Sequence, residues 1–267
     1  MRCFKRRLRN KKVVSSIIVA LLLCLVVFLA WPAQTSAPIQ QASAAKKAAN
    51  SPTANHFNKL QYPTGAASSL WAVVNKGRQL PSGYVPAGLT VPNVPLRLSA
   101  SSLEMHVRSD TASALEALFA AAKKDGINLM LGSGYRSYSN QVATYNGFVQ
   151  TDGVAKADTY SARPGHSEHQ TGLAVDVEPT TRNCEFEQCF ENTPEGQWLA
   201  ANSYKFGFIV RYQKDTQALT GYEYEPWHVR YVGTDLAAQI NQNHQTLEQF
   251  FDLPVYTSYP DQSLQLN

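Results

Sequence analysis

The spacing of apolar residues predicts helices and strands from the middle of the chain onward. A first helix is expected to start at the N-cap residue Asp110 and to stop at Gly126. Its core-facing side is formed by apolar residues at helical spacing: Leu115, Leu118, Phe119 and Ala122. Buried strands are expected at 127–133, which is almost wholly apolar, and at 173–177, which is rich in β-branched residues. A second helix is expected from Ser137, after the first of these strands.

The later part of the chain extends this pattern with two helices and two strands. Thr193 is expected to cap a helix, and strands are expected at 206–212 and 227–232. A final helix is expected to begin at its cap Thr234 and to continue through Phe250. The strands are too irregularly joined for repeated βαβ units, so an α+β domain with a mostly antiparallel central sheet flanked by helices fits best.

Residues 1–37 have the composition of an export segment. Seven basic residues and no acidic residue precede an apolar run from Val13 to Trp31. The run approaches the ~17–25 residues that span a bilayer, which favours an uncleaved anchor, and a small-residue site ending at Ala37 leaves a cleaved signal peptide open. The positive-inside rule places the basic cluster in the cytoplasm. The remaining chain is therefore expected outside, anchored to the cell membrane or secreted.

The rest of the chain divides into a tether and a domain. Residues 38–54 are rich in Ala, Ser, Thr, Gln, Pro and Lys and are expected to form a flexible tether. Residues 55–267 are expected to form one domain, whose proline-rich first part wraps around it as an extended segment. Without the leader's seven basic residues, 17 Lys and Arg remain against 20 Asp and Glu, a formal charge of −3. This charge does not favour a nucleic-acid partner, and a monomer is assumed.

Two short segments contain the residues with the clearest chemistry, SEHQTGLAVDV at 167–177 and EPWHVRY at 225–231. Among their residues, two imidazoles and two carboxylates stand in contexts suited to a catalytic zinc ion: His169, Asp176, Glu225 and His228. Two histidines and one carboxylate leave a fourth tetrahedral position open, which is typical of a catalytic zinc site. The remaining carboxylate can then serve as a base for water.

Cys184 and Cys189 are the two cysteines of the part expected outside the cell. In an oxidising environment this isolated pair favours a local disulfide that closes the loop CEFEQC. Half of a zinc site is the alternative, but a second matching cysteine pair is missing.

The same two segments, together with SGYRSYSNQ at 133–141, resemble the VanY-type carboxypeptidases of bacterial cell walls. That family shares its zinc architecture with lysostaphin-type peptidases and the hedgehog signalling domain. The resemblance covers about residues 70–235 and implies the corresponding fold. It also implies zinc as the cofactor and peptidoglycan stem peptides as the substrate.

By position, the resemblance implies roles for seven residues. His169, Asp176 and His228 would bind zinc, and Glu225 would take the proton from the attacking water. Arg136 would pair with the terminal carboxylate of the substrate, because a guanidinium group matches a carboxylate with two parallel hydrogen bonds. The peptide backbone would be held with the help of Gln141 and Ser167, although Ser167 could instead cap its loop.

The leading hypothesis is therefore a zinc carboxypeptidase that removes the terminal D-alanine from stem peptides, with D,D- and L,D-cleavage both open. Two alternatives remain. A wall endopeptidase would not need Arg136 to meet a carboxylate, and a zinc-containing binding module would have no need of Glu225.

Overall fold

The computed structural model describes residues 58–267, so the expected leader and tether lie outside the described residues. The chain separates into two units, Met1–Asn55 and His56–Asn267, and only the second is described here. Within the described residues, no helix is long and apolar enough to cross a membrane.

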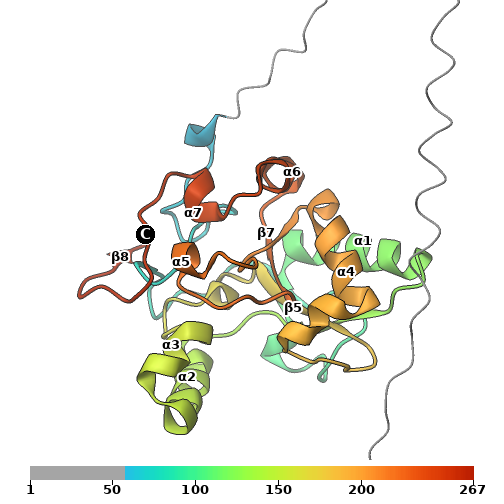
Figure 1. The fold of residues 1–267 in the computed structure, drawn as a ribbon, viewed down its shortest axis with the longest axis horizontal. Helices are drawn as coiled ribbons and strands as arrows, with labels where there is room; N and C mark the ends of the chain where they lie inside the picture. The colour runs from blue at the N-terminus through green and yellow to red at the C-terminus, as the bar shows by residue number, and fades with distance from the viewer. Residues whose placement is uncertain (1–57) are drawn as a thin grey trace, which may run out of the picture. The chain divides into compact units, whose positions relative to one another are not determined.

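The centre of the domain is a four-stranded antiparallel sheet with the order β4-β5-β7-β6 (Figure 1). Its strands are β4 (Leu129–Ser133), β5 (Ala174–Pro179), β6 (Phe208–Val210) and β7 (His228–Tyr231). These four strands confirm the predicted α+β class and its antiparallel sheet. The residues of β4 and β5 are buried on both faces.

One face of the sheet is apolar and packs on two helices. Val175, Val177 and Val229 lie in one buried cluster with α1 (Ser109–Lys124) and α4 (Pro194–Asn202). Because side chains alternate along a strand, their neighbours lie on the opposite face. That opposite face carries buried polar groups instead: Asp176, Glu178, His228 and Arg230. The sheet therefore places its ionisable residues together on one side.

The polar face contacts the first part of the described chain, which also pairs with the last part. Arg230 donates from Nη2 to the backbone oxygens of Leu70 and Ala72, at 2.9 and 2.8 Å. At the chain's end, β8 (Leu264–Gln265) pairs in parallel with β1 (Arg78–Gln79). The last strand is therefore β8, not β7 as the sequence predicted. Antiparallel pairing between β2 (Leu89–Thr90) and β3 (Val107–Arg108) adds to the extended wrap that was expected before the first helix.

The helix ends match the sequence in part. Ser137 caps α2 (Tyr138–Asp152) and Thr193 caps α4, each by accepting a backbone N–H. Asp110 is not the N-cap of α1, because the helix already begins at Ser109. Its carboxylate accepts the N–H of Thr111 and pairs with Arg108.

The predicted final helix is two helices. The chain leaves α6 (Thr234–Asn243) through His244, which has a left-handed φ of 51°. A capping box at Thr246 then starts α7 (Leu247–Phe250). Apolar residues of both helices belong to one buried cluster, so the spacing of apolar residues continues across the break.

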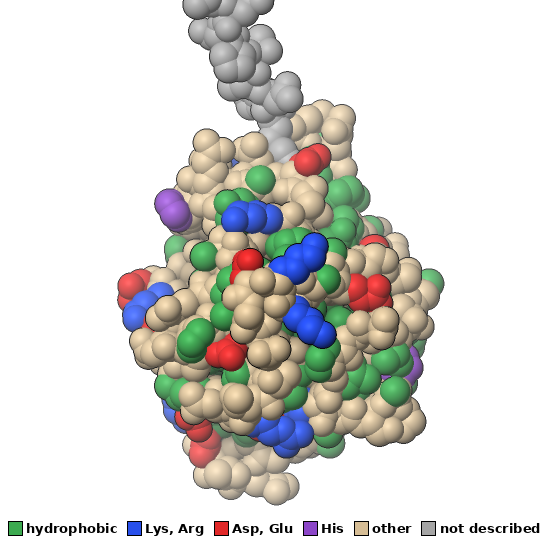
Figure 2. Space-filling view, turned by 90° about the vertical axis from the view of Figure 1, so that its right-hand side faces the viewer, with side chains coloured by type: hydrophobic (Ala, Val, Ile, Leu, Met, Phe, Trp, Pro, Cys, Tyr) green, Lys and Arg blue, Asp and Glu red, His purple; other side chains and the backbone are tan. Residues whose placement is uncertain are grey.

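The remaining helices and 3₁₀ turns are short connections: η1 (Lys59–Gln61), η2 (Leu103–Met105), α3 (Val154–Tyr160), η3 (Glu168–Thr171), η4 (Gln188–Asn192), η5 (Ser203–Phe206) and α5 (Gln217–Thr220). The hairpin of α2 and α3 lies apart from α1 and α4 (Figure 1). On the face drawn in Figure 2, acidic and basic side chains are interspersed without a large field of one sign.

Candidate metal centre and active site

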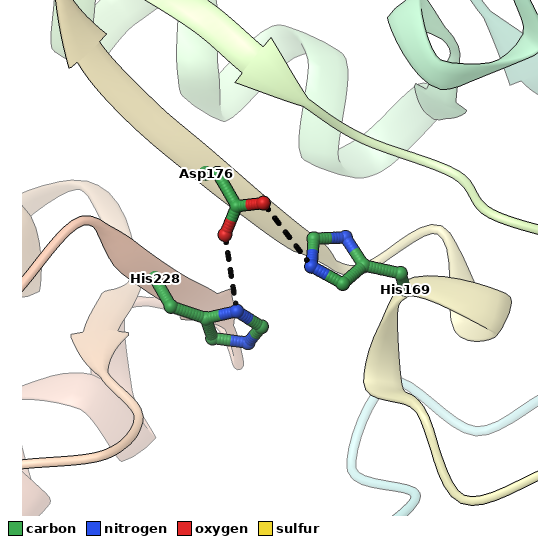
Figure 3. A group of neighbouring side chains, drawn as sticks. All are labelled: His169, Asp176 and His228. Atoms are coloured by element: carbon green, nitrogen blue, oxygen red, sulfur yellow. Dashed lines mark hydrogen bonds and ion pairs between the residues drawn. The ribbon is translucent and has the colours of Figure 1, made fainter. Parts of the chain in front are cut away.

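Three buried side chains converge where β5 and β7, the two central strands, pair with each other (Figure 3). Asp176 pairs in register with His228, and His169 reaches the same point from η3. One Asp176 oxygen lies 3.1 Å from Nδ1 of His228, and the other lies 3.3 Å from Nε2 of His169. One potential ligand atom from each residue lies within 4.8 Å of the others. The predicted ligands are thus brought together from two strands and a turn.

The orientation of His169 is set by the backbone. Its Nδ1 donates to the carbonyl oxygen of Gly134 at 2.7 Å, which leaves Nε2 facing Asp176. The turn that carries His169 ends at Gly172, whose φ of 68° suits glycine. A histidine that donates one ring N–H to a carbonyl can offer the other nitrogen to a metal ion.

The orientation of His228 involves a residue that the sequence analysis did not single out. Its Nε2 lies 3.9 Å from Oε2 of Glu168, and both atoms are buried without a hydrogen-bond partner. Oε1 of Glu168 accepts hydrogen bonds from Arg211 and Arg230, each at 2.9 Å. Arg211 in turn forms two hydrogen bonds with Glu248 of α7. A fully buried charge network therefore stands directly behind His228.

The electrostatic field of the site favours positive charge. Burial alone would raise the pKa of Asp176, but the two histidines outweigh it and hold that pKa well below its usual range. Burial opposes the charged form of His228, yet its contacts with Asp176, Glu168 and Glu225 raise its pKa to about 9. Burial lowers the pKa of His169. The negative charge around His228 can therefore be balanced in either of two ways, by a proton on His228 or by a divalent cation bound between the three side chains.

The donor set fits zinc. Two imidazoles and one carboxylate are the ligands of many catalytic zinc sites, and they leave a position free for water or substrate. The buried, unpaired Nε2 of His228 faces a carboxylate, as expected where an outer carboxylate orients a ligating histidine. His169, Asp176 and His228 would hold the ion.

Glu225 lies beside this group. Its Oε2 is 3.5 Å from Nδ1 of His228, and its side chain is 12% exposed. The backbone N–H of His228 donates to the carbonyl oxygen of Glu225, so a tight turn through Pro226 places both residues. Burial raises the pKa of Glu225 to about 8. A carboxylate with a raised pKa can accept and return a proton near neutral pH.

Arg136 faces the same cavity and is held on two sides. It donates to Oγ of Ser133 at 3.1 Å and to Oε1 of Gln141 at 3.2 Å. Gln141 also donates to the carbonyl oxygen of Ala162 at 2.6 Å. Both ends of the Gln141 amide are therefore engaged within the protein, an arrangement suited to orienting Arg136.

Ser167 lies at the start of η3 but makes no capping hydrogen bond there. Its side chain instead lines a cavity of about 990 Å³. The lining of this cavity includes all seven residues predicted for zinc, proton transfer and substrate: Arg136, Gln141, Ser167, His169, Asp176, Glu225 and His228. Trp227 also lines the cavity and packs partly against the apolar core.

Cys184 and Cys189 form a disulfide in the structure. Glu178 lies on the same face of β5 as Asp176 and is fully buried. Its Oε1 accepts the backbone N–H of Phe186, within the disulfide loop, at 3.1 Å.

Three neighbouring residues outside the predicted set are buried. His166 is 6% exposed and donates to the carbonyl oxygen of Asn75. Tyr212 packs on the imidazole of His228 with ring centroids 5.0 Å apart. A local signal for Glu168 existed, since it lies beside His169 in the motif, but its arginine partners are distant in sequence.

Comparisons with known proteins agree with this site. The sequence model of the VanY family, described as D-alanyl-D-alanine carboxypeptidase, matches residues 104–234. YodJ of Bacillus subtilis (strain 168), a carboxypeptidase by name, is 40% identical over 202 residues, which cover 74% of each chain.

Two solved structures are similar as well. The LD-carboxypeptidase LdcB has a TM-score of 0.67 and 42% identity, over 70% of this chain and 87% of its own. A variant of the D,D-pentapeptidase VanY in complex with Zn(II) has a TM-score of 0.53 and 34% identity, over 67% of this chain and 96% of its own.

Replacing Glu168 with glutamine should destabilise the folded protein, because Arg211 and Arg230 would keep their buried charges without the shared carboxylate. We expect a loss of about 3–5 kcal/mol in urea unfolding and zinc binding weakened by about 10–100-fold. The control is Glu191→Gln, which removes an exposed ion pair with Lys214 and should cost less than about 1 kcal/mol. Equal effects of the two variants would show that the network does not support the site.

Proposed function

Because the chain belongs to the VanY family of D-alanyl-D-alanine carboxypeptidases, we propose that it is a zinc-dependent carboxypeptidase that removes the C-terminal D-alanine from peptidoglycan stem peptides. The observation that carries this proposal is the single cavity that contains a metal-binding trio, a proton-accepting carboxylate and a held arginine. Each of these parts has a separate task in cleaving a peptide at its end.

Arg136 would bind the terminal carboxylate of the substrate. Its guanidinium group is fixed by Ser133 and Gln141, so less side-chain freedom is lost when the carboxylate binds. Arg136 lines the same cavity as His169 and Glu225, and its charge partly offsets the burial that raises the pKa of Glu225. A terminal carboxylate bound by the arginine would therefore place the last peptide bond in the cavity that holds these groups.

Glu225 would move the proton. When bound, zinc supplies Lewis acidity, which brings the pKa of water toward ~7 and polarises a carbonyl group. Glu225 accepts one proton of the attacking water, whose oxygen adds to the scissile carbonyl carbon. The C–N bond then breaks, and Glu225 returns the proton to the leaving amine. The products are a shortened stem with a new carboxylate and free D-alanine.

The tetrapeptide stem is the substrate that we favour. The similarity to the LD-carboxypeptidase LdcB exceeds the similarity to the D,D-pentapeptidase VanY in both TM-score and identity. An L,D-enzyme would release D-alanine from a tetrapeptide, and a D,D-enzyme would release it from a pentapeptide.

Mass spectrometry of defined tetrapeptide and pentapeptide stems tests this function. The zinc-loaded protein should release one alanine, faster from the tetrapeptide, and a chelator should abolish the release. Glu225→Gln should lower kcat by about 10²–10⁴-fold while zinc remains bound, because the proton acceptor is lost. Glu191→Gln serves as the matched control and should retain activity. If the wild-type protein holds zinc but releases alanine from neither stem, a binding module becomes the better description.

Substrate amidation tests whether Arg136 recognises a chain end. Amidation of the terminal carboxylate should lower kcat/KM of the wild-type protein by about 10–100-fold, because a charge-assisted hydrogen-bond pair is lost. In Arg136→Ala, activity should fall for both peptides and the ratio between them should approach one. The ratio separates carboxylate recognition from a general effect of the arginine on the zinc site. Equal cleavage of the free and amidated peptides by the wild-type protein would favour an endopeptidase.

We further propose that the protein acts outside the cytoplasm, attached to the bacterial membrane by its N-terminal segment. Support comes from the basic cluster followed by the apolar run of 13–31. In fractionated cells the full-length chain should be found with membranes, and protease added outside should digest its catalytic part after the wall is removed. Recovery of the intact chain from the cytoplasm would contradict this location.

A further inference from the structure

The disulfide loop forms part of the cavity wall, although none of the roles assigned above uses it. Three residues of this loop, Phe186, Glu187 and Gln188, line the cavity together with the metal-binding trio. Phe186 is the apolar member and is half-buried. We propose that Phe186 bounds the pocket for the residue that is released and limits the size of that residue's side chain.

Phe186 lies next to the group that holds Arg136. A Cβ atom built on Gly132 would lie 3.3 Å from Cε1 of Phe186 and 2.8 Å from Cγ of Glu178. Gly132 directly precedes Ser133, whose hydroxyl accepts a hydrogen bond from Arg136. The absence of a side chain at Gly132 therefore lets the ring of Phe186 approach β4 within one residue of the arginine's support. A terminal residue whose carboxylate meets Arg136 would carry its side chain in this neighbourhood.

Three separate anchors hold the loop in place. Its ends are joined by the Cys184–Cys189 disulfide, and the backbone N–H of Phe186 donates to the buried Oε1 of Glu178. The guanidinium group of Arg97 lies 5.1 Å from the centre of the Phe186 ring. Arg97 also donates from Nε to the carbonyl oxygen of Gly132 at 2.8 Å. The ring is thus fixed against the strand that leads to Ser133.

The backbone of the loop needs these anchors. Arg182, Cys184 and Phe186 all have left-handed φ values, of 59°, 60° and 53°. Residues other than glycine adopt this region at a cost and keep it only where surrounding contacts enforce it. A loop held in this way forms a rigid part of the cavity wall. Because a rigid apolar wall cannot move aside, it discriminates between side chains by size, and one additional methylene changes binding by roughly 10–200-fold.

This inference rests on the proposed carboxypeptidase function, and in particular on Arg136 as the carboxylate partner. The test compares kcat/KM for stem peptides that end in D-alanine or in the larger D-leucine. We expect the wild-type protein to prefer D-alanine strongly, and Phe186→Ala to reduce this preference by at least about 10-fold. The double variant Cys184→Ser/Cys189→Ser, which releases the loop, should reduce it in the same direction. Zinc content and the unfolding midpoint verify that each variant is folded.

Phe148→Ala is the matched control, because it removes the same side chain from α2, which lines another part of the cavity. It should leave the ratio between the two terminal residues at the wild-type value. Phe186→Leu keeps apolar bulk and should retain most of the preference.

The outcomes separate the two proposals. If the wild-type protein releases no D-alanine, the proposed function fails and this inference fails with it. If it releases D-alanine but Phe186→Ala keeps the wild-type ratio, only the inference fails. A change confined to peptides that vary the residue before the cleaved bond would also overturn it, since the ring would then face the retained part of the stem.

Discussion

The site depends on the buried ion pairs that Glu168 forms with Arg211 and Arg230. Glu168 follows directly before the ligand residue His169, and its second oxygen faces the ring of His228. The residue thereby connects both metal-binding histidines to the interior of the protein, His169 through the backbone and His228 through the carboxylate. Through Arg211 the link continues to Glu248 in α7, and through Arg230 it continues to the backbone at Leu70 and Ala72. Segments that lie far apart in sequence are thus joined at the metal centre.

Such a network is tolerated because its charges balance. Two buried carboxylates face two buried guanidinium groups, and most of their polar atoms are hydrogen-bonded. Burying ions costs free energy that good geometry can offset, so the benefit lies less in stability than in a unique arrangement. A site that must hold an ion and a peptide in fixed relation gains from that uniqueness, since rigid donors need not reorganise when the reaction begins.

Local pattern predicted much of this protein, and its failures have a common cause. An apolar run located β4, β-branched residues located β5, and hydroxyl residues located the starts of α2 and α4, because these signals act within a few residues. The two motifs indicated the candidate metal ligands, and the pairing of β5 with β7 brings them together. The break at His244 was missed because one apolar period continues across two helices. The roles of Glu168 and His166 were not predicted, since their surroundings depend on partners such as Arg211 and Asn75 that only the tertiary fold supplies.

The parallel pairing of β1 with β8 joins the beginning of the described domain to its last residues. Leu266 donates its N–H to the carbonyl oxygen of Gln79, and it is 1% exposed within a small apolar cluster. Contacts of this sequence separation raise the contact order of the domain, and loop closure over such a distance slows folding. The pairing cannot form until β8 has been synthesised, long after β1. The part of the domain around β1 therefore reaches its native arrangement only when residues from both ends of the described domain are present.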